Sequence, residues 1–162
     1  SDSFTAYATY AYTKAELTSD APYLFNADGT DGAKDGDRLP GSPEHQFSMG
    51  INYQTEVFND KTLDINYGLT AQSDVISKVG LRDNGEALPG YSLSNISAKL
   101  TADAWSTTLY VDNLFNKYAV TSVRRSDADI TTANGAYIQR NYVYFINRPL
   151  TFGIKFNYQF EI

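Results

Sequence analysis

Apolar and polar residues alternate with a period of two along several stretches of the chain. In segment 151–162, every second residue from Phe152 to Ile162 is apolar, and none of the residues between them is. Segments 47–57 and 63–72 largely repeat this pattern. Because successive side chains of a β-strand point to opposite faces, each segment has one apolar and one polar face. No stretch shows the 3.6-residue period of an amphipathic helix, so the chain is predicted to be all-β.

The pattern predicts six strands, joined by connections of two different lengths. The strands are expected at 4–17, 45–57, 62–76, 91–102, 105–118 and 138–160. The connections at 18–44, 77–90 and 119–137 are long, and those at 58–61 and 103–104 are short. Alternating long and short connections are typical of an antiparallel up-and-down transmembrane β-barrel, and the strands exceed the roughly 5–6 residues usual in soluble sheets. The fourth strand changes phase between Leu93 and Ile96, which indicates a β-bulge or a strand that leaves the membrane.

In a membrane barrel the apolar faces meet lipid and the polar faces line the interior. The residues expected to face lipid are Phe47, Met49, Ile51, Leu63, Ile65, Tyr67, Phe152, Ile154, Phe156, Tyr158 and Phe160. The residues expected to face the interior are Asn52, Gln54, Asp64, Asn66, Gln72, Lys155, Asn157 and Gln159. This polar wall could contact an internal domain or a passing substrate, although any water-filled barrel is polar inside. Trp105 and Tyr118, at opposite ends of the fifth strand, fit the two aromatic girdles of such barrels.

Composition excludes several other classes of protein. The net charge is −6, and Arg124-Arg125 is the one adjacent basic pair, which argues against nucleic-acid binding. Cysteine is absent and His45 is the sole histidine, so disulfides, thiolate metal sites and multi-histidine zinc sites are excluded. No nucleophile–base arrangement and no phosphate-binding glycine motif occurs, so we expect neither enzymatic activity nor a cofactor. The strands of a soluble β-sandwich would also show alternating apolar and polar residues, but the strand length and the unequal connections favour a membrane barrel.

If the short turns face the periplasm, the three long connections face outward and hold the candidate ligand contacts. Tyr23 and Phe25 could stack on a sugar or an aromatic ligand, or could simply pack at the rim. A basic and acidic group consists of Arg124, Arg125, Asp127, Asp129 and Arg140. It could bind an anionic ligand through bidentate arginine contacts, or form a solvated loop whose charges cancel.

Segment 26–37 is rich in glycine and contains Asp28, Asp31, Asp35 and Asp37. Calcium prefers six to eight oxygen ligands, but the aspartate spacing does not match the calcium loop motif. A flexible acidic loop is the preferred interpretation. No metal site is predicted, and His45 is expected to be structural.

Four stretches resemble the C-terminal part of the TonB-dependent outer-membrane receptors. They are RLPGSPEHQFSMGINYQ (38–54), LPGYSLSNISAKL (88–100), LYVDNLFNKYAV (109–120) and RPLTFGIKFNYQF (148–160). The third is similar to the family's Asn-Leu-Phe-Asp-Lys-x-Tyr run, with Asn116 at the usual acidic position. The family commonly ends on an aromatic residue, whereas Glu161 and Ile162 follow Phe160 here.

The resemblance implies the last six strands of a plugged barrel of about 22 strands in the bacterial outer membrane. It implies active import of a scarce nutrient of the siderophore, cobalamin or oligosaccharide class. The implied partners are outer-membrane lipid, the earlier strands, the plug domain and, through the plug, TonB. The plug and the TonB-contacting segment are not recognised in these residues, so a fragment, a split subunit or part of a larger protein is expected. The alternatives are a small self-assembling pore or adhesin, and a soluble carbohydrate-binding β-sandwich.

Overall fold

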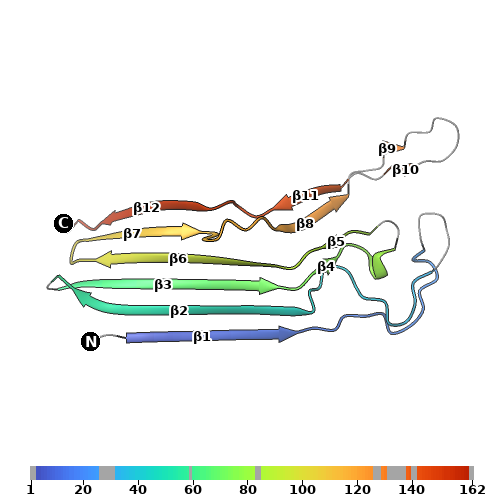
Figure 1. Cartoon of the computed structure of the whole chain (residues 1–162), viewed down its shortest axis with the longest axis horizontal. Coiled ribbons are helices and arrows are strands. Elements are labelled where there is room, and N and C mark those ends of the chain that lie inside the picture. The colour runs from blue at the N-terminus through green and yellow to red at the C-terminus, as the bar shows by residue number, and fades with distance from the viewer. Residues whose placement is uncertain are drawn as a thin grey trace.

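A computed structural model of the chain describes residues 3–25, 32–58, 60–82, 85–125, 129–130, 138–139 and 142–160. Its main feature is a six-stranded antiparallel sheet with the order β1-β2-β3-β6-β7-β12 (Figure 1). The strands are β1 (Ser3–Tyr12), β2 (His45–Val57), β3 (Lys61–Gln72), β6 (Tyr91–Thr101), β7 (Trp105–Asp112) and β12 (Thr151–Tyr158). The short turns and both chain ends lie at one end of this sheet (Figure 1). The predicted all-β, up-and-down architecture is confirmed.

The smaller elements lie at the opposite end of the sheet, which we call the loop end (Figure 1). Here β4 (Val75–Ile76) pairs with β5 (Ala87–Leu88), and the 3₁₀ turn η1 (Val79–Leu81) lies between them in sequence. A second hairpin pairs β8 (Val120–Arg125) with β11 (Tyr142–Ile146), and a third pairs β9 (Asp129–Ile130) with β10 (Ile138–Gln139).

Several predicted strand ends are wrong, and each is wrong at the loop end. The first strand ends at Tyr12, because the chain beyond it bonds irregularly to 36–44. The third ends at Gln72 and separates from β4 at Ser73-Asp74, whose polar groups bond to other loop residues. The fifth ends at Asp112, so Tyr118 lies beyond the strand.

The region after β7 differs most from the prediction. Segment 119–137, predicted to be a connection, contains β8 and β9. The single strand predicted at 138–160 is divided into β10, β11 and β12. The break between β11 and β12 contains Pro149, which has no backbone N–H to donate to a strand ladder. The chain therefore forms an extra hairpin beyond the sheet.

The strand register is continuous through all five pairings of the main sheet, so cross-strand neighbours form rows. One row consists of Ala6, Ile51, Tyr67, Ile96, Val111 and Phe152. The adjacent row consists of Thr5, Asn52, Asn66, Ser97, Tyr110 and Gly153. We call the two sides of the sheet the apolar face and the polar face after these rows. Within the strands, the residues predicted to face lipid lie on the first and those predicted to face the interior lie on the second.

The phase change in β6 involves no bulge, because its pairing with β3 and β7 is regular. Ser92 and Ser94 instead lie on the apolar face near the loop end, opposite Ala71 and Leu69. Of the two explanations predicted, the bulge is therefore wrong. Beyond β12, the Gln159 amide donates to the Ala104 carbonyl at 2.8 Å, and Phe160 contacts the Tyr158 ring edge-on.

The buried apolar residues of the described chain lie outside the main sheet. They are Ala21, Ala33, Val75, Ile76, Leu88 and Ala119. Large apolar side chains on the sheet are instead exposed, for example Phe152 (78% exposed) and Phe4 (68%). A soluble β-sandwich would bury such a face against a second sheet. Within the described residues, no helix is long and apolar enough to span a bilayer.

Candidate functional site

The candidate site lies at the loop end, where segment 13–44 folds against segment 73–82. Backbone hydrogen bonds join Leu39 to Ala15 at 2.8 Å and Leu17 to Asp37 at 2.9 Å. Another joins the Gly41 amide to the Ile76 carbonyl at 2.9 Å. These bonds hold the described parts of the long first connection against the β4–β5 hairpin, so that they form a layer beyond the sheet.

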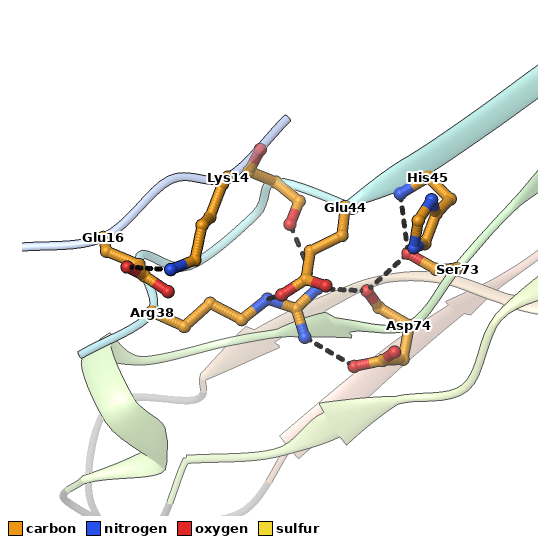
Figure 2. A network of polar contacts seen from close by, with 8 residues as sticks. Lys14, Glu16, Arg38, Glu44, His45, Ser73 and Asp74 are labelled. Carbon is orange, nitrogen blue, oxygen red and sulfur yellow. Dashed lines mark hydrogen bonds and ion pairs between the residues drawn. The ribbon is translucent and has the colours of Figure 1, made fainter. Parts of the chain in front are cut away.

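Arg38 anchors this layer (Figure 2). Its guanidinium contacts the Asp74 carboxylate at 2.6 Å, donates to the Asp74 carbonyl at 2.6 Å and donates to the Ser42 carbonyl at 3.2 Å. The Glu44 carboxylate lies 3.7 Å from Arg38 Nε. The Arg38 side chain is only 21% exposed, so its charge is compensated within the fold. Sequence analysis gave Arg38 no role, and nothing in the pattern distinguishes it from a solvated arginine.

His45 joins the ends of β1, β2 and β3. Its Nδ1 is 2.8 Å from the Tyr10 hydroxyl, and its ring lies 5.2 Å from the Tyr12 ring. Its backbone exchanges hydrogen bonds with Ser73 (Figure 2). These contacts gather three aromatic rings, those of Tyr10, Tyr12 and His45, at one edge of the apolar face.

Two predicted ligand contacts, Tyr23 and Phe25, line a pocket of about 250 Å³ together with Leu24, Lys78, Val79 and Arg82. Tyr23 is 75% exposed and Phe25 is 52% exposed. Arg82 also pairs with the Asp37 carboxylate. The pocket therefore combines aromatic rings with two cations, and it draws them from separate segments of the chain. Lys78 and Arg82 were missed by sequence analysis, because the two connections meet only in the folded structure.

The backbone around Ala21 and Ala33 positions the aromatic residues of this pocket. The two alanines are buried and exchange backbone hydrogen bonds of 2.8 and 3.2 Å. Leu24 bonds to the Ala21 carbonyl at 3.0 Å. A Cβ at Gly32 would overlap the Pro22 backbone, so only glycine fits there. The turn that presents Tyr23 and Phe25 is thus well defined.

Asp20, Lys34 and Asp35 form polar contacts that hold the described parts of the acidic first connection together. The Asp20 carboxylate accepts from the Asp35 amide at 3.0 Å and from Lys34 at 3.1 Å. These contacts lower the pKa of Asp20, with the Asp35 amide contributing most. Where the chain is described, no three acidic or histidine residues cluster as a metal site. Asp28 and Asp31 lie outside the described residues.

The structure separates the predicted arginine group from this pocket. Arg124 and Arg125 lie in β8, opposite Val143 and Tyr142 of β11, and not in a loop. Asp129 lies in β9. Asp127 and Arg140 lie outside the described residues, so that candidate group stays a prediction.

Comparison with known proteins agrees with this architecture. The family model for the TonB-dependent receptor-like β-barrel matches residues 2–114, which is more than half of the chain. The chain belongs to this family. The predicted resemblance is thereby confirmed, and the chain is of the outer-membrane receptor or transporter kind, which is not an enzyme family. No curated protein and no solved structure matches the chain.

The family-model match to this receptor barrel ends at residue 114, just after β7 and within the sequence DNLFNKY (112–118). There Asn113, Asn116 and Asn147 form a cluster that we call the asparagine clasp. Asn113 is 8% exposed, and its side-chain oxygen accepts a hydrogen bond from the Lys117 amide at 2.8 Å. Its side-chain nitrogen donates to the Lys117 carbonyl at 2.9 Å and to the Arg148 carbonyl at 3.0 Å.

Asn147 and Asn116 complete the clasp from both sides. Asn147 accepts from the Ala119 amide at 2.8 Å and donates to the Lys117 and Arg148 carbonyls at 2.9 Å each. Asn116 accepts from the Leu150 amide at 3.1 Å. The clasp therefore satisfies the backbone groups left free where the β7–β12 ladder stops and the β8–β11 hairpin begins. In this sequence the family-like motif performs a structural task.

The β8–β11 hairpin of the receptor also contacts the β4–β5 hairpin. Partial burial raises the pKa of the Tyr144 phenol, and the neighbouring Glu86 carboxylate raises it further. The loop end is therefore a connected layer, held by the clasp at one point and by Arg38 at another.

Proposed function

We propose that this chain is the C-terminal barrel segment of an outer-membrane receptor that imports a scarce nutrient using energy transmitted by TonB. The observation that carries the proposal is the family match, which covers five of the six strands of the main sheet completely, all but β12. The nutrient belongs to the siderophore, cobalamin or oligosaccharide class. Import rather than catalysis is proposed, and no nucleic acid is involved.

The dimensions of the apolar face support a membrane location. From His45 to Thr55 along β2, a rise of about 3.4 Å per residue and a tilt of about 40° give a height of about 26 Å. Outer-membrane barrels have an apolar band about 25 Å tall with aromatic girdles. Tyr10, Tyr12 and His45 lie at one limit of this band, and Trp105 and Tyr158 lie near the other.

The free edges of the sheet support a larger barrel. Among the described residues, β1 and β12 each pair on one side only. In lipid, unpaired backbone groups of a strand cost several kcal/mol each, so open edges do not occur there. We infer that β1 and β12 pair with further strands in the assembled receptor.

The pocket at Tyr23 and Phe25 is proposed as part of the outward-facing ligand site. Its exposed aromatic rings suit a sugar or another group with a flat apolar face.

An uptake assay tests the function. Cells with the full-length receptor as their one importer of this kind would be supplied with iron–siderophore complexes, cobalamin or oligosaccharides at limiting concentration. We expect uptake of one of these, and its loss when TonB is deleted. Uptake that is independent of TonB, or ion conductance by the purified protein without TonB, would instead identify a passive pore.

A further inference from the structure

A groove of about 310 Å³ lies on the polar face where β1 and β3 end and β2 and β6 begin (Figure 1). Residues of two adjacent rows of this face line most of it. Their polar side chains are Thr9, Gln46, Ser48, Thr70, Gln72 and Tyr91. None of the described residues that line the groove is charged, so we call it the uncharged groove. It adjoins the layer of segments 13–44 and 73–82, which contains the pocket at Tyr23 and Phe25.

Three side chains of one row keep their hydrogen-bonding capacity free. Gln46 and Gln72 are cross-strand neighbours, and Tyr91 is the neighbour of Gln72 on the next strand. Among the described residues, neither glutamine amide nor the Tyr91 hydroxyl has a hydrogen-bond partner. In the row beside them, the Thr9 and Ser48 hydroxyls bond to each other at 2.6 Å. The groove therefore presents a row of unpaired amides and a hydroxyl to whatever enters it.

The chemistry of these groups favours a ligand that is neutral and rich in hydroxyls. A glutamine amide and a tyrosine hydroxyl both donate and accept hydrogen bonds. A carboxylate or phosphate only accepts and an ammonium only donates, so each would leave groups unmatched and would meet no opposite charge here. Sugar hydroxyls donate and accept as well, so neighbouring hydroxyls match paired amides such as those of Gln46 and Gln72.

Tyr91 adds a flat apolar surface to the groove. Its side chain is half-buried, and its ring offers an apolar body next to the polar hydroxyl. A sugar ring also has an apolar face bordered by hydroxyls, so it suits a tyrosine ring beside two amides. The exposed rings of Tyr23 and Phe25 in the neighbouring pocket offer the same kind of surface. Both places therefore suit the same chemical class.

The absence of charge is local and does not describe the whole polar face. Asp112 and Arg148 line a second groove of about 300 Å³ on this face, and Lys155 joins them in a third of about 340 Å³. Asp64 and Lys99 lie opposite each other nearer the short turns. A polar barrel interior accounts for polar residues in general, but it does not account for a groove with amides, hydroxyls and a ring alone.

We propose that the uncharged groove binds a neutral oligosaccharide. Gln46 and Gln72 bond to its hydroxyls, and the Tyr91 ring contacts an apolar face of a sugar ring. The volume of the groove lies within the range of roughly 300–1,000 Å³ that small-molecule sites occupy. The inference narrows the nutrient class of the proposed function and rests on it in one respect, that the polar face lines the path of the nutrient.

Equilibrium binding to the purified full-length receptor tests this proposal. The probes are short neutral oligomers of glucose, mannose, xylose or galactose. The comparison ligands are oligomers of the matching uronic acids, a glycine–serine peptide, cobalamin and an iron–siderophore complex. We expect one neutral oligomer to bind, and its acidic counterpart to bind about tenfold more weakly or worse, since a carboxylate cannot donate to the amides.

Matched variants locate the site. Gln46→Glu keeps the length of the side chain but removes its donor, so it should weaken binding of the neutral oligomer about tenfold. Gln54→Glu makes the same change on the same face at the other end of β2, and it should leave the affinity unchanged. Tyr91→Ala should also weaken binding about tenfold, whereas Tyr91→Phe, which keeps the ring, should retain most of it.

Three results would overturn the proposal. The first is that no neutral oligomer binds, whether or not another ligand does. The second is that the acidic oligomer or the peptide binds as tightly as the neutral sugar. The third is equal affinity in the Gln46→Glu and Gln54→Glu proteins, which would place the sugar elsewhere. TonB-dependent uptake of cobalamin or a siderophore without sugar binding would refute the groove and leave the proposed function intact. Sugar binding without TonB-dependent uptake would do the reverse.

Discussion

The side-chain amide of Asn113 donates a hydrogen bond to the backbone carbonyl of Arg148, 3.0 Å away and 35 residues further along the chain. This bond crosses the point where the β7–β12 ladder ends. Asn113 has a φ of 51°, in the left-handed region that asparagine tolerates better than most residues. Both its backbone conformation and its side-chain bonds therefore favour asparagine at this position.

We predict that Asn113→Ala destabilises the full-length receptor by about 1–3 kcal/mol, because it removes three hydrogen bonds and leaves the Lys117 amide without its side-chain partner. Asn113→Gly relieves the backbone strain but also removes the bonds, so most of the loss should remain. Asn157→Ala, on the exposed polar face, is the control and should change stability little. Urea unfolding in detergent would measure all three. Equal stability of the Asn113 and Asn157 variants would show that the clasp contributes nothing.

The lipid-facing assignment predicts opposite effects for two adjacent residues of β2. Ile51 lies near the middle of the apolar face and Asn52 lies next to it on the polar face. Ile51→Arg should cost about 2–4 kcal/mol in folding into lipid vesicles, as for arginine near a bilayer midplane. Asn52→Arg should cost much less, because the interior is wet. Similar losses from both substitutions would mean that the assignment of the faces is wrong.

Most of the sheet could be predicted from the sequence, because period-two alternation is a local signal that each strand carries by itself. Residues such as Ile51 and Asn52 are assigned to a face by their position alone. The prediction was wrong where the signal is not local. Segment 120–125 pairs with 142–146 across a long connection, and nothing in its own pattern indicates its partner.

The candidate site was harder to predict for the same reason. The aromatic character of Tyr23 and Phe25 was visible in the sequence, but their juxtaposition with Lys78 and Arg82 depends on how two long connections fold together. Asn113 was visible only as part of a family-like motif. Its bonds to Lys117 and Arg148 became evident when the structure showed which backbone groups were left without strand partners.

The pKa of Asp20 predicts a change in the first connection at low pH. Its folded-state value is lowered from 3.8, so the contribution of its contacts is present above that pH and is lost as the pH falls through the lower folded value. We expect protection of the Asp35 amide from hydrogen exchange to persist at pH 5 and to decline below about pH 3.8. The comparison is with Asp20→Ala at each pH, which removes the acceptor and corrects for intrinsic exchange. Equal protection in both proteins at pH 5 would contradict the prediction.

The ligand pocket predicts selective losses of binding. Tyr23→Ala and Phe25→Ala should each weaken binding of the imported nutrient about tenfold, a typical cost of removing a buried aromatic contact of about 1.4 kcal/mol. Phe115→Ala, at an exposed position near the clasp, is the control. Equilibrium binding to the purified receptor would measure the effect. Unchanged affinity in both pocket variants would place the ligand elsewhere.

On the polar face, tyrosine rings lie over glycines of the adjacent strand. For one such pair, we predict that the same glycine substitution destabilises the receptor when the ring is present and stabilises it when the ring is absent. Gly50 of β2 lies opposite Tyr7 of β1, and a Cβ on Gly50 would overlap the Tyr7 ring. Gly50→Val should therefore destabilise the receptor by about 1–3 kcal/mol, since the ring must move away. In a Tyr7→Ala background the overlap is gone, and the strand preference of valine over glycine should make the same substitution stabilising. A double-mutant cycle by urea unfolding isolates this coupling. If Gly50→Val has the same effect in both backgrounds, the requirement for glycine comes from something other than the ring.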